Sequence, residues 1–142
     1  MIVGLTALAV LVAVAATFLL TATFVGTRLP VAHHVSRSAR YAEPVAKVWD
    51  AVSDPRSARA FGALRVEQAT PVPGRVLIRR IVGGRDFGGT WTYELAPDGS
   101  GTRLTITEEG EVPSPLLRFL SRFVFGHARA LDTYLEALRR QL

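Results

Sequence analysis

Glu108 is a carboxylate on a strand face that is otherwise apolar, and such a group could carry acid–base chemistry. Polar and apolar residues alternate along Thr102–Glu109, so Glu108 continues the face that carries Leu104 and Ile106. A carboxylate that faces inward at the rim of a pocket can act as an acid, a base or a hydrogen-bond acceptor. The alternative is that the strand ends here and Glu108 is solvated, because the three carboxylates of "EEGE" favour water.

Two adjacent arginines offer a second polar feature. Arg79 and Arg80 lie in the β-rich run Arg75–Val82, where consecutive side chains point to opposite faces of a sheet. One of the two therefore points inward, and the sequence does not decide which. An inward Arg could bind a ligand carboxylate or pair with Glu108, whereas an Arg at the rim could keep its guanidinium in water.

Metal and cofactor chemistry have little support in the sequence. The histidines are His33, His34 and His127, and there is no cysteine, so the usual metal ligands are sparse. The phosphate loop, the dinucleotide fingerprint and the nucleophile elbow are all missing. We therefore predict no metal and no cofactor, and we identify no catalytic motif.

The charge pattern points away from nucleic acid. The chain has 17 basic and 12 acidic residues, for a net charge of +5, and every basic residue except Lys47 is Arg. These charges are scattered and form no block of the kind found in nucleic-acid-binding arms, so no nucleic-acid partner is predicted. A basic chain beside a membrane would instead favour anionic lipid headgroups.

The chain opens with a long uncharged run, residues 2–27. About 20 apolar residues in a helix cross the hydrocarbon core of a bilayer, so we predict a transmembrane helix over residues 1–27 and a connector over residues 28–34. A cleaved signal peptide is the alternative, although no positive region precedes the run. Arg28, Arg37 and Arg40 follow the run, which predicts a single-pass membrane protein whose C-terminal domain is cytoplasmic.

The elements of residues 35–142 indicate one α+β domain. A weak first strand over residues 33–41 precedes a helix that opens at Pro44 and ends before Pro55. Its apolar face has helical spacing and carries Val45, Val48, Trp49 and Val52. A further short helix over residues 56–62 and strands over residues 63–69, 75–82, 90–95 and 102–109 follow.

The last two strands predict a hairpin around the turn composition "APDGSG". If Ala96 pairs with Gly101, the opposed pairs are chemically sensible: Glu94 with Arg103, Tyr93 with Leu104, Thr92 with Thr105, and Trp91 with Ile106. One face of the hairpin is then apolar and needs a cover. Residues 116–142 supply it, because their apolar stripe predicts one long helix of about 40 Å.

Two longer patterns carry a family resemblance. They are "P-x-x-x-V-W-x-x-x-x-D-P" from Pro44 and "G-G-T-W-T-Y-E-L-x-P-x-G-x-G-T-R-L-T-I-T-E-x-G" from Gly88. With the long closing helix, they make residues 35–142 resemble the SRPBCC (START-like, helix-grip) superfamily, most of all its polyketide cyclase/dehydrase and lipid-transport group. The resemblance implies an antiparallel sheet wrapped on a long C-terminal helix around an apolar cavity. The family usually has about seven strands, whereas this chain has material for about five, which implies a smaller or more open cavity, or none.

The resemblance and the residues together give a functional prediction. We predict a membrane-tethered domain that binds a hydrophobic small molecule or lipid, with membrane lipid as its second partner. The alternatives are a polyketide cyclase or dehydratase-like enzyme, and a reduced helix-grip domain that binds another protein. The candidate pocket-lining residues are Trp49, Val52, Trp91, Tyr93, Leu104, Ile106, Glu108, Phe123 and His127.

Overall fold

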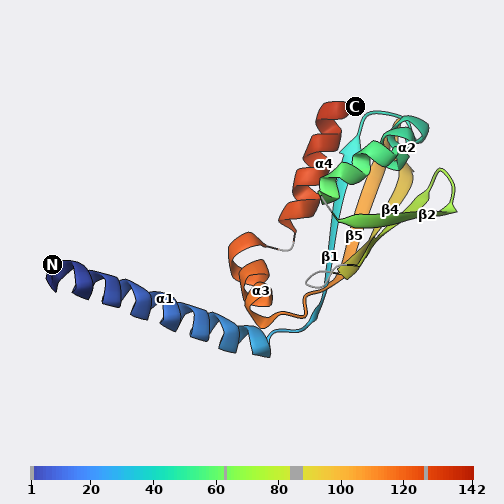
Figure 1. The fold of residues 1–142 in the computed structure, drawn as a ribbon. Coiled ribbons are helices and arrows are strands. Elements are labelled where there is room, and N and C mark those ends of the chain that lie inside the picture. The colour runs from blue at the N-terminus through green and yellow to red at the C-terminus, as the bar shows by residue number, and fades with distance from the viewer. Residues whose placement is uncertain (1, 63, 84–87, 127) are drawn as a thin grey trace.

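The computed structural model describes residues 2–62, 64–83, 88–126 and 128–142 (Figure 1). The helical elements are α1 (Ile2–Arg28), α2 (Val45–Ser53), the 3₁₀ helix η1 (Pro55–Phe61), α3 (Pro115–Leu120), the π-helical turn η2 (Ser121–Phe125) and α4 (Arg129–Gln141). The strands are β1 (Ala32–Tyr41), β2 (Arg65–Val72), β3 (Val76–Val82), β4 (Gly88–Asp98) and β5 (Gly101–Glu111).

The strands form one antiparallel sheet in the order β1-β5-β4-β3-β2. Helices α2 and α4 cover one face of this five-stranded sheet, and α1 extends away from it (Figure 1). The predicted α+β architecture with about five strands is therefore confirmed. The covered face holds the apolar core, and the site described below lies between this face and α4.

Helix α2 forms and stops where its sequence predicts. Pro44 precedes it in an extended conformation, which suits a proline at a helix start. Val48 and Val52, four residues apart on one face, are fully buried against the sheet and α4. Asp54 then accepts a hydrogen bond from the backbone N–H of Arg56 and begins η1.

The β4–β5 hairpin corrects the predicted register. Asp98 pairs with Gly101, so Tyr93 lies opposite Ile106 and Trp91 lies opposite Glu108. The predicted pairing of Ala96 with Gly101 is wrong, because β4 continues through Pro97 to Asp98 and the turn is only Gly99–Ser100, with Gly99 at φ +62°. A slip of two residues preserves the face of every side chain, so the predicted apolar face still points into the core.

The closing helix is also corrected. Residues 116–142 do not form one long helix, because α3 and η2 end at Gly126, whose φ of +72° lies in the left-handed region. Within the described part of residues 116–142, it is α4 that packs on the sheet, through Leu131, Tyr134, Leu135 and Leu138. Helix α3 instead packs against α1, where Ala22 is almost fully buried and a Cβ at Gly26 would overlap the carbonyl of Pro115.

Helix α1 is long and apolar enough over Gly4–Arg28 to cross a membrane, judged by length and composition. Most of the side chains described along it are exposed, among them Leu5, Leu11 and Leu20. This agrees with the predicted apolar segment and leaves the orientation of the domain as a prediction.

Candidate functional site: a cavity at one end of the sheet

A cavity of about 910 Å³ lies between α4, η1 and the end of the sheet where β4 begins and β5 ends. Its lining is mainly apolar and includes Phe61, Leu64, Ile81, Trp91, Tyr134 and Leu138. Polar groups approach it from several elements, and the best placed of them are His33 of β1 and Glu108 of β5. The sequence left open whether the five-stranded sheet keeps a cavity, and the structure places a space of this kind beside α4.

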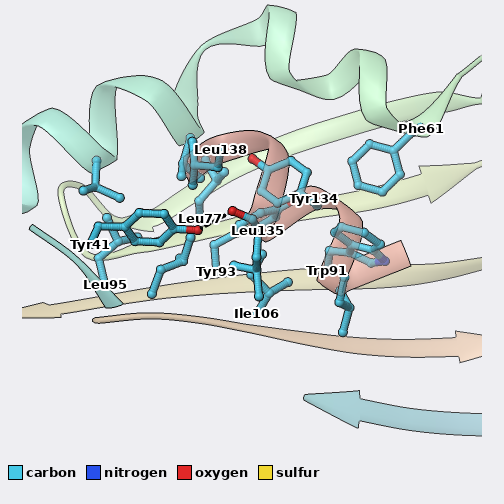
Figure 2. Close-up of a cluster of buried hydrophobic side chains, with 14 residues drawn as sticks. Tyr41, Phe61, Leu77, Trp91, Tyr93, Leu95, Ile106, Tyr134, Leu135 and Leu138 are labelled. Carbon is cyan, nitrogen blue, oxygen red and sulfur yellow. Dashed lines mark hydrogen bonds between the residues drawn. The ribbon is translucent and has the colours of Figure 1, made fainter. Parts of the chain in front are cut away.

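Aromatic rings separate the cavity from the packed core. Trp91 packs edge-on against Phe61, with ring centroids 4.7 Å apart, and edge-on against Tyr134 at 5.9 Å. Tyr134 in turn contacts Tyr93 at 5.6 Å. Figure 2 shows this row of rings, with Phe61 and Trp91 at one end of the cluster and Tyr41 at the other. Because edge-to-face pairs hold each ring in one orientation, they give the cavity a stable apolar wall.

His33 and Glu108 form a polar pair on the cavity lining. His33 Nε2 lies 3.2 Å from Glu108 Oε1, and the two side chains are only 15% and 19% exposed. The pair spans β1 and β5, where His33 is opposite Gly110. A Cβ at Gly110 would overlap the His33 ring, so this glycine provides the space in which the imidazole lies.

Glu108 retains unused hydrogen-bonding capacity. Its second carboxylate oxygen, Oε2, is buried and receives no hydrogen bond from the described residues. Buried carboxylate oxygens are normally satisfied, so Oε2 is suited to accept a hydrogen bond from a hydroxyl or amine group of a bound molecule. A carboxylate next to an imidazole can also hold and transfer a proton.

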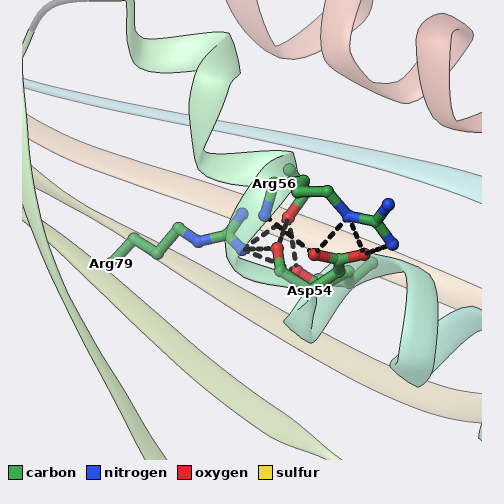
Figure 3. A network of polar contacts seen from close by, with 5 residues as sticks. Asp54, Arg56 and Arg79 are labelled. Carbon is green, nitrogen blue, oxygen red and sulfur yellow. Dashed lines mark hydrogen bonds and ion pairs between the residues drawn. The ribbon is translucent and has the colours of Figure 1, made fainter.

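Arg79 is the inward arginine of the pair that the sequence left undecided. It is fully buried, while Arg80 is exposed. Its guanidinium donates to the carbonyl oxygen of Val52 at 2.7 Å and to Ser57 Oγ at 2.6 Å (Figure 3). It also donates to the carbonyl of Asp54 at 3.3 Å and to Gln68 Oε1 at 3.1 Å.

These contacts give Arg79 a structural task. A cation placed at the C-terminal end of α2 is favoured by the helix dipole and satisfies carbonyls that have no partner within the helix. Its contacts join the end of α2 to η1 and to β2, so its donors are used here and not on Glu108. Arg79 is therefore part of the frame that positions η1, and with it Phe61, beside the cavity.

Two buried phenols of the core, those of Tyr41 and Tyr93, have raised pKa values. Burial raises the pKa of Tyr41 from 10.0 to about 12, and its hydroxyl donates to the carbonyl of Leu135 at 2.9 Å. Burial also raises the pKa of Tyr93 well above its ordinary value. Neither tyrosine can act as a phenolate base near neutral pH, which leaves the His33–Glu108 pair as the best-placed group for proton transfer.

The structure divides the predicted site residues. Trp91 and Glu108 line the cavity. Four others, fully buried, lie in the packed core beneath α2 and α4, because the side chains there fill the space completely: Val52, Tyr93, Leu104 and Ile106. Trp49 is partly buried against this core and does not line the cavity.

The last two predicted residues lie elsewhere. Phe123 is 60% exposed on η2 and packs against Phe119 at 5.0 Å, because the helix breaks before it can follow the sheet. His127 lies outside the described residues. Sequence reasoning missed His33, although its position two residues before Val35, on the inward face of β1, was a signal that could have found it.

Several solved structures share this architecture. A START superfamily protein from Mycobacterium smegmatis aligns with a TM-score of 0.55 and 16% identity, over 77% of this chain and 98% of that chain. A conserved protein from Geobacillus kaustophilus gives a TM-score of 0.63 and 15% identity, over 77% and 94%. The di-domain ARO/CYC StfQ from the steffimycin biosynthetic pathway gives 0.54 and 10%, over 78% of this chain and 50% of that chain.

The chain thus has a START-like fold, with an antiparallel sheet packed on a C-terminal helix, as the sequence predicts. No protein-family model matches the sequence, and no curated protein matches it. At the identities given above, the similarity to the solved structures is one of fold. The function is therefore argued from the cavity itself.

Proposed function

We propose that the chain is a membrane-tethered domain that binds a hydrophobic small molecule or lipid in the cavity beside Trp91. The observation that carries the proposal is the mainly apolar space of about 910 Å³ between α4 and the sheet. Small-molecule sites commonly measure roughly 300–1,000 Å³ and combine apolar walls with a few polar groups. The fold, shared with a START superfamily protein and an ARO/CYC protein, supports the same reading.

Burial of apolar ligand surface would contribute to the binding free energy, and the His33–Glu108 pair would orient the ligand. Each 100 Å² of apolar ligand surface removed from water contributes about 2.5 kcal/mol, before the cost of immobilising the ligand. Glu108 Oε2, which has no hydrogen bond from the described residues, would accept one from a ligand hydroxyl or amine. The ligand class is therefore an apolar molecule with at least one hydrogen-bond donor.

The tether would hold this cavity where such molecules concentrate. In this proposal, residues 1–27 cross the bilayer, residues 28–34 connect, and residues 35–142 form the binding domain on the cytoplasmic side. The support is the length and composition of α1 and the arginines that follow it.

The test fills the cavity from α4. Ala137 lines it, and Ala46 lies exposed on α2 away from it, so Ala137→Trp and Ala46→Trp are matched helical substitutions. The full-length protein, purified in detergent, is analysed by native mass spectrometry and by titration with an apolar fluorescent probe. Ala137→Trp should lose co-purified ligand and probe binding, while Ala46→Trp keeps both. Unchanged binding in Ala137→Trp would contradict the proposal.

The His33–Glu108 pair favours acid–base catalysis on a hydrophobic substrate as a second candidate function. The pair lines the cavity, is largely buried and can exchange a proton with a bound group. Glu108→Gln preserves shape and removes the base. A catalyst would lose turnover in this variant while keeping its bound substrate, whereas a pure binding protein would show no turnover in either form. A protein-interaction domain has less support than either, because a mainly apolar space lies beside α4.

A further inference from the structure

The segment Pro115–Phe125, made of α3 and η2, exposes an unusual amount of apolar surface. Phe123, Val124 and Phe125 are 60%, 55% and 58% exposed and are consecutive in the chain. Three adjacent large apolar side chains in contact with water are unfavourable, and such patches mark binding surfaces. The π-helical turn and the break at Gly126 bring this patch to the surface instead of onto the sheet.

The same segment is fixed to α1. The Phe119 ring packs edge-on against Phe18, with centroids 6.1 Å apart. At the other end of the contact, Arg118 donates from its guanidinium to the carbonyl of Leu29 at 2.7 Å. The backbone of Pro115 lies so close to Gly26 that a Cβ there would overlap it. In Figure 1, α3 lies beside the C-terminal turns of α1, between that helix and the rest of the domain.

This contact determines where the segment lies if α1 crosses a membrane. Phe18 precedes Arg28 by ten residues, which is about 15 Å along a helix axis. A side chain that packs on Phe18 therefore lies on the membrane side of Arg28, and the segment that carries it cannot stand clear of the bilayer.

We infer that residues 115–125 form a second membrane-embedded element, which enters the leaflet that contains the C-terminal end of α1. Phe123, Val124 and Phe125 insert among lipid chains, and the guanidinium groups of Arg118 and Arg122 lie at headgroup level. The charges fit this placement, because residues 112–131 contain no acidic side chain. Such a basic, aromatic segment favours a bilayer with anionic lipids.

The embedded segment also borders the cavity. Phe125 and Gly126 contribute to the cavity lining, so the segment that enters the bilayer also forms part of the cavity wall. A lipid-soluble ligand could then pass between the bilayer and the cavity along the segment without crossing water. This consequence rests on the proposed binding function, whereas the embedding of residues 115–125 rests only on the proposed tether.

The absence of cysteine makes a direct test practical. Single variants Phe123→Cys and Val124→Cys carry an NBD fluorophore in the full-length protein, in vesicles of phosphatidylcholine and phosphatidylglycerol. Leu11→Cys, in the middle of α1, is the deep control, and Ser100→Cys, on the β4–β5 turn, is the aqueous control. Quencher lipids with a doxyl group near the headgroup or deep in the chain report the depth of each fluorophore.

The labels at positions 123 and 124 should show blue-shifted emission and quenching by the doxyl lipids. Leu11→Cys should also be blue-shifted and quenched, and Ser100→Cys should be neither. Aqueous emission at positions 123 and 124, with Leu11→Cys still deep, would overturn the inference and leave the tether intact. A blue shift that disappears as lipid dilutes the protein would assign the patch to a second copy of the chain, which also overturns it. An aqueous Leu11→Cys label would overturn the tether and the inference together.

Discussion

The two ends of the helix–sheet interface use the same strands, β4 and β5, and are filled very differently. At the packed end, beneath α2, every side chain of the central cluster is fully buried: Val48, Val52, Leu77, Tyr93 and Leu104. At the hollow end, beside η1, the sheet presents Gly88 and Gly89, and the cavity opens between Trp91 and α4. The difference arises from side-chain volume on neighbouring positions of the same two strands.

Glycine pairing explains most of this difference. Gly89 lies opposite Gly110 on the same face as Trp91 and Glu108, so two neighbouring strands contribute no side chain over the core at this pair. A Cβ at Gly89 would come within 2.8 Å of the carbonyl oxygen of Glu109, so the strands are also too close there to accept a larger residue. The same strands carry Tyr93, Leu95 and Leu104 a few residues further on, where the core is closed.

A matched pair of leucine truncations tests whether the two ends of the helix–sheet interface differ in packing. Leu104→Ala at the packed end should lower the free energy of unfolding by about 2–5 kcal/mol, because it leaves a new cavity in a close-packed core. Leu138→Ala, beside the existing cavity, should cost clearly less, because fewer contacts are lost there. Chemical denaturation of the full-length protein in detergent measures both. Equal losses would show that the two ends are packed alike.

Arg79→Met probes the frame that holds the packed end against η1. Removing the guanidinium takes a charged donor from Ser57 Oγ and from the Val52 carbonyl, which keeps only its hydrogen bond from Ser57, and the expected loss is about 2–4 kcal/mol. Arg80→Met, the neighbouring exposed arginine, is the control and should change stability little. Because η1 carries Phe61, Arg79→Met should also weaken probe binding in the cavity. If Arg79→Met leaves the free energy of unfolding unchanged, the hydrogen bonds of Arg79 do not stabilise the fold.

We expect alkaline pH to lower the stability of the protein mainly by ionising buried tyrosines of the packed core. The folded state raises the pKa of Tyr41 to about 12 and raises the pKa of Tyr93 further, so folding favours the protonated phenols. This stability is complete below the unfolded pKa of about 10 and is lost as the pH rises through the folded values. Denaturation midpoints measured from neutral pH to about pH 12 should therefore fall above pH 10. Tyr41→Phe should make the denaturation midpoint fall less steeply above about pH 10. An equally steep fall in this variant would show that ionisation of Tyr41 does not cause the loss of stability.

The smallest expected effect tests the hairpin register, which places Trp91 and Glu108 together at the hollow end. Arg103 pairs with Asp98 at 2.7 Å on the outer face, and not with Glu94. A double-mutant cycle of Asp98→Asn and Arg103→Gln should give a coupling of about 0.2–1 kcal/mol. The cycle of Glu94→Gln and Arg103→Gln should give none. The reverse result would restore the register that pairs Ala96 with Gly101.

The sequence predicts the sheet and its faces well because alternation has a physical cause that is local. Residues Trp91, Tyr93, Leu104 and Ile106 alternate with polar neighbours, and all of them point into the core as expected. The register could not be obtained in the same way, because a slip of two residues leaves the alternation unchanged. The length of the turn sets the register of the hairpin. We expected Pro97 to lie in the turn, but β4 continues through this residue.

The cavity was harder to predict than the sheet, because an unfilled space depends on how the helices and strands pack in three dimensions and not on a local sequence pattern. A single glycine is tolerated within a helix at a cost of about 1 kcal/mol, so Gly126 did not by itself predict the break that separates α3 from α4. A helix without that break would direct Phe123 toward the sheet. His33 falls where the predicted connector and the predicted first strand overlap, whereas β1 begins at Ala32 and carries His33 inward beside Glu108.

The two tryptophans of the chain offer the most direct measurement of the hollow end against the packed end. Trp91 lines the cavity, and Trp49 packs against the core outside it. Trp49→Phe and Trp91→Phe each leave one tryptophan, whose fluorescence is recorded while a brominated fatty alcohol is added to the full-length protein in detergent; bromine quenches only at short range. The account predicts saturable quenching of Trp91 in Trp49→Phe and none of Trp49 in Trp91→Phe. Quenching of neither tryptophan, or of both alike, would contradict a ligand cavity confined to the end of the sheet beside Glu108.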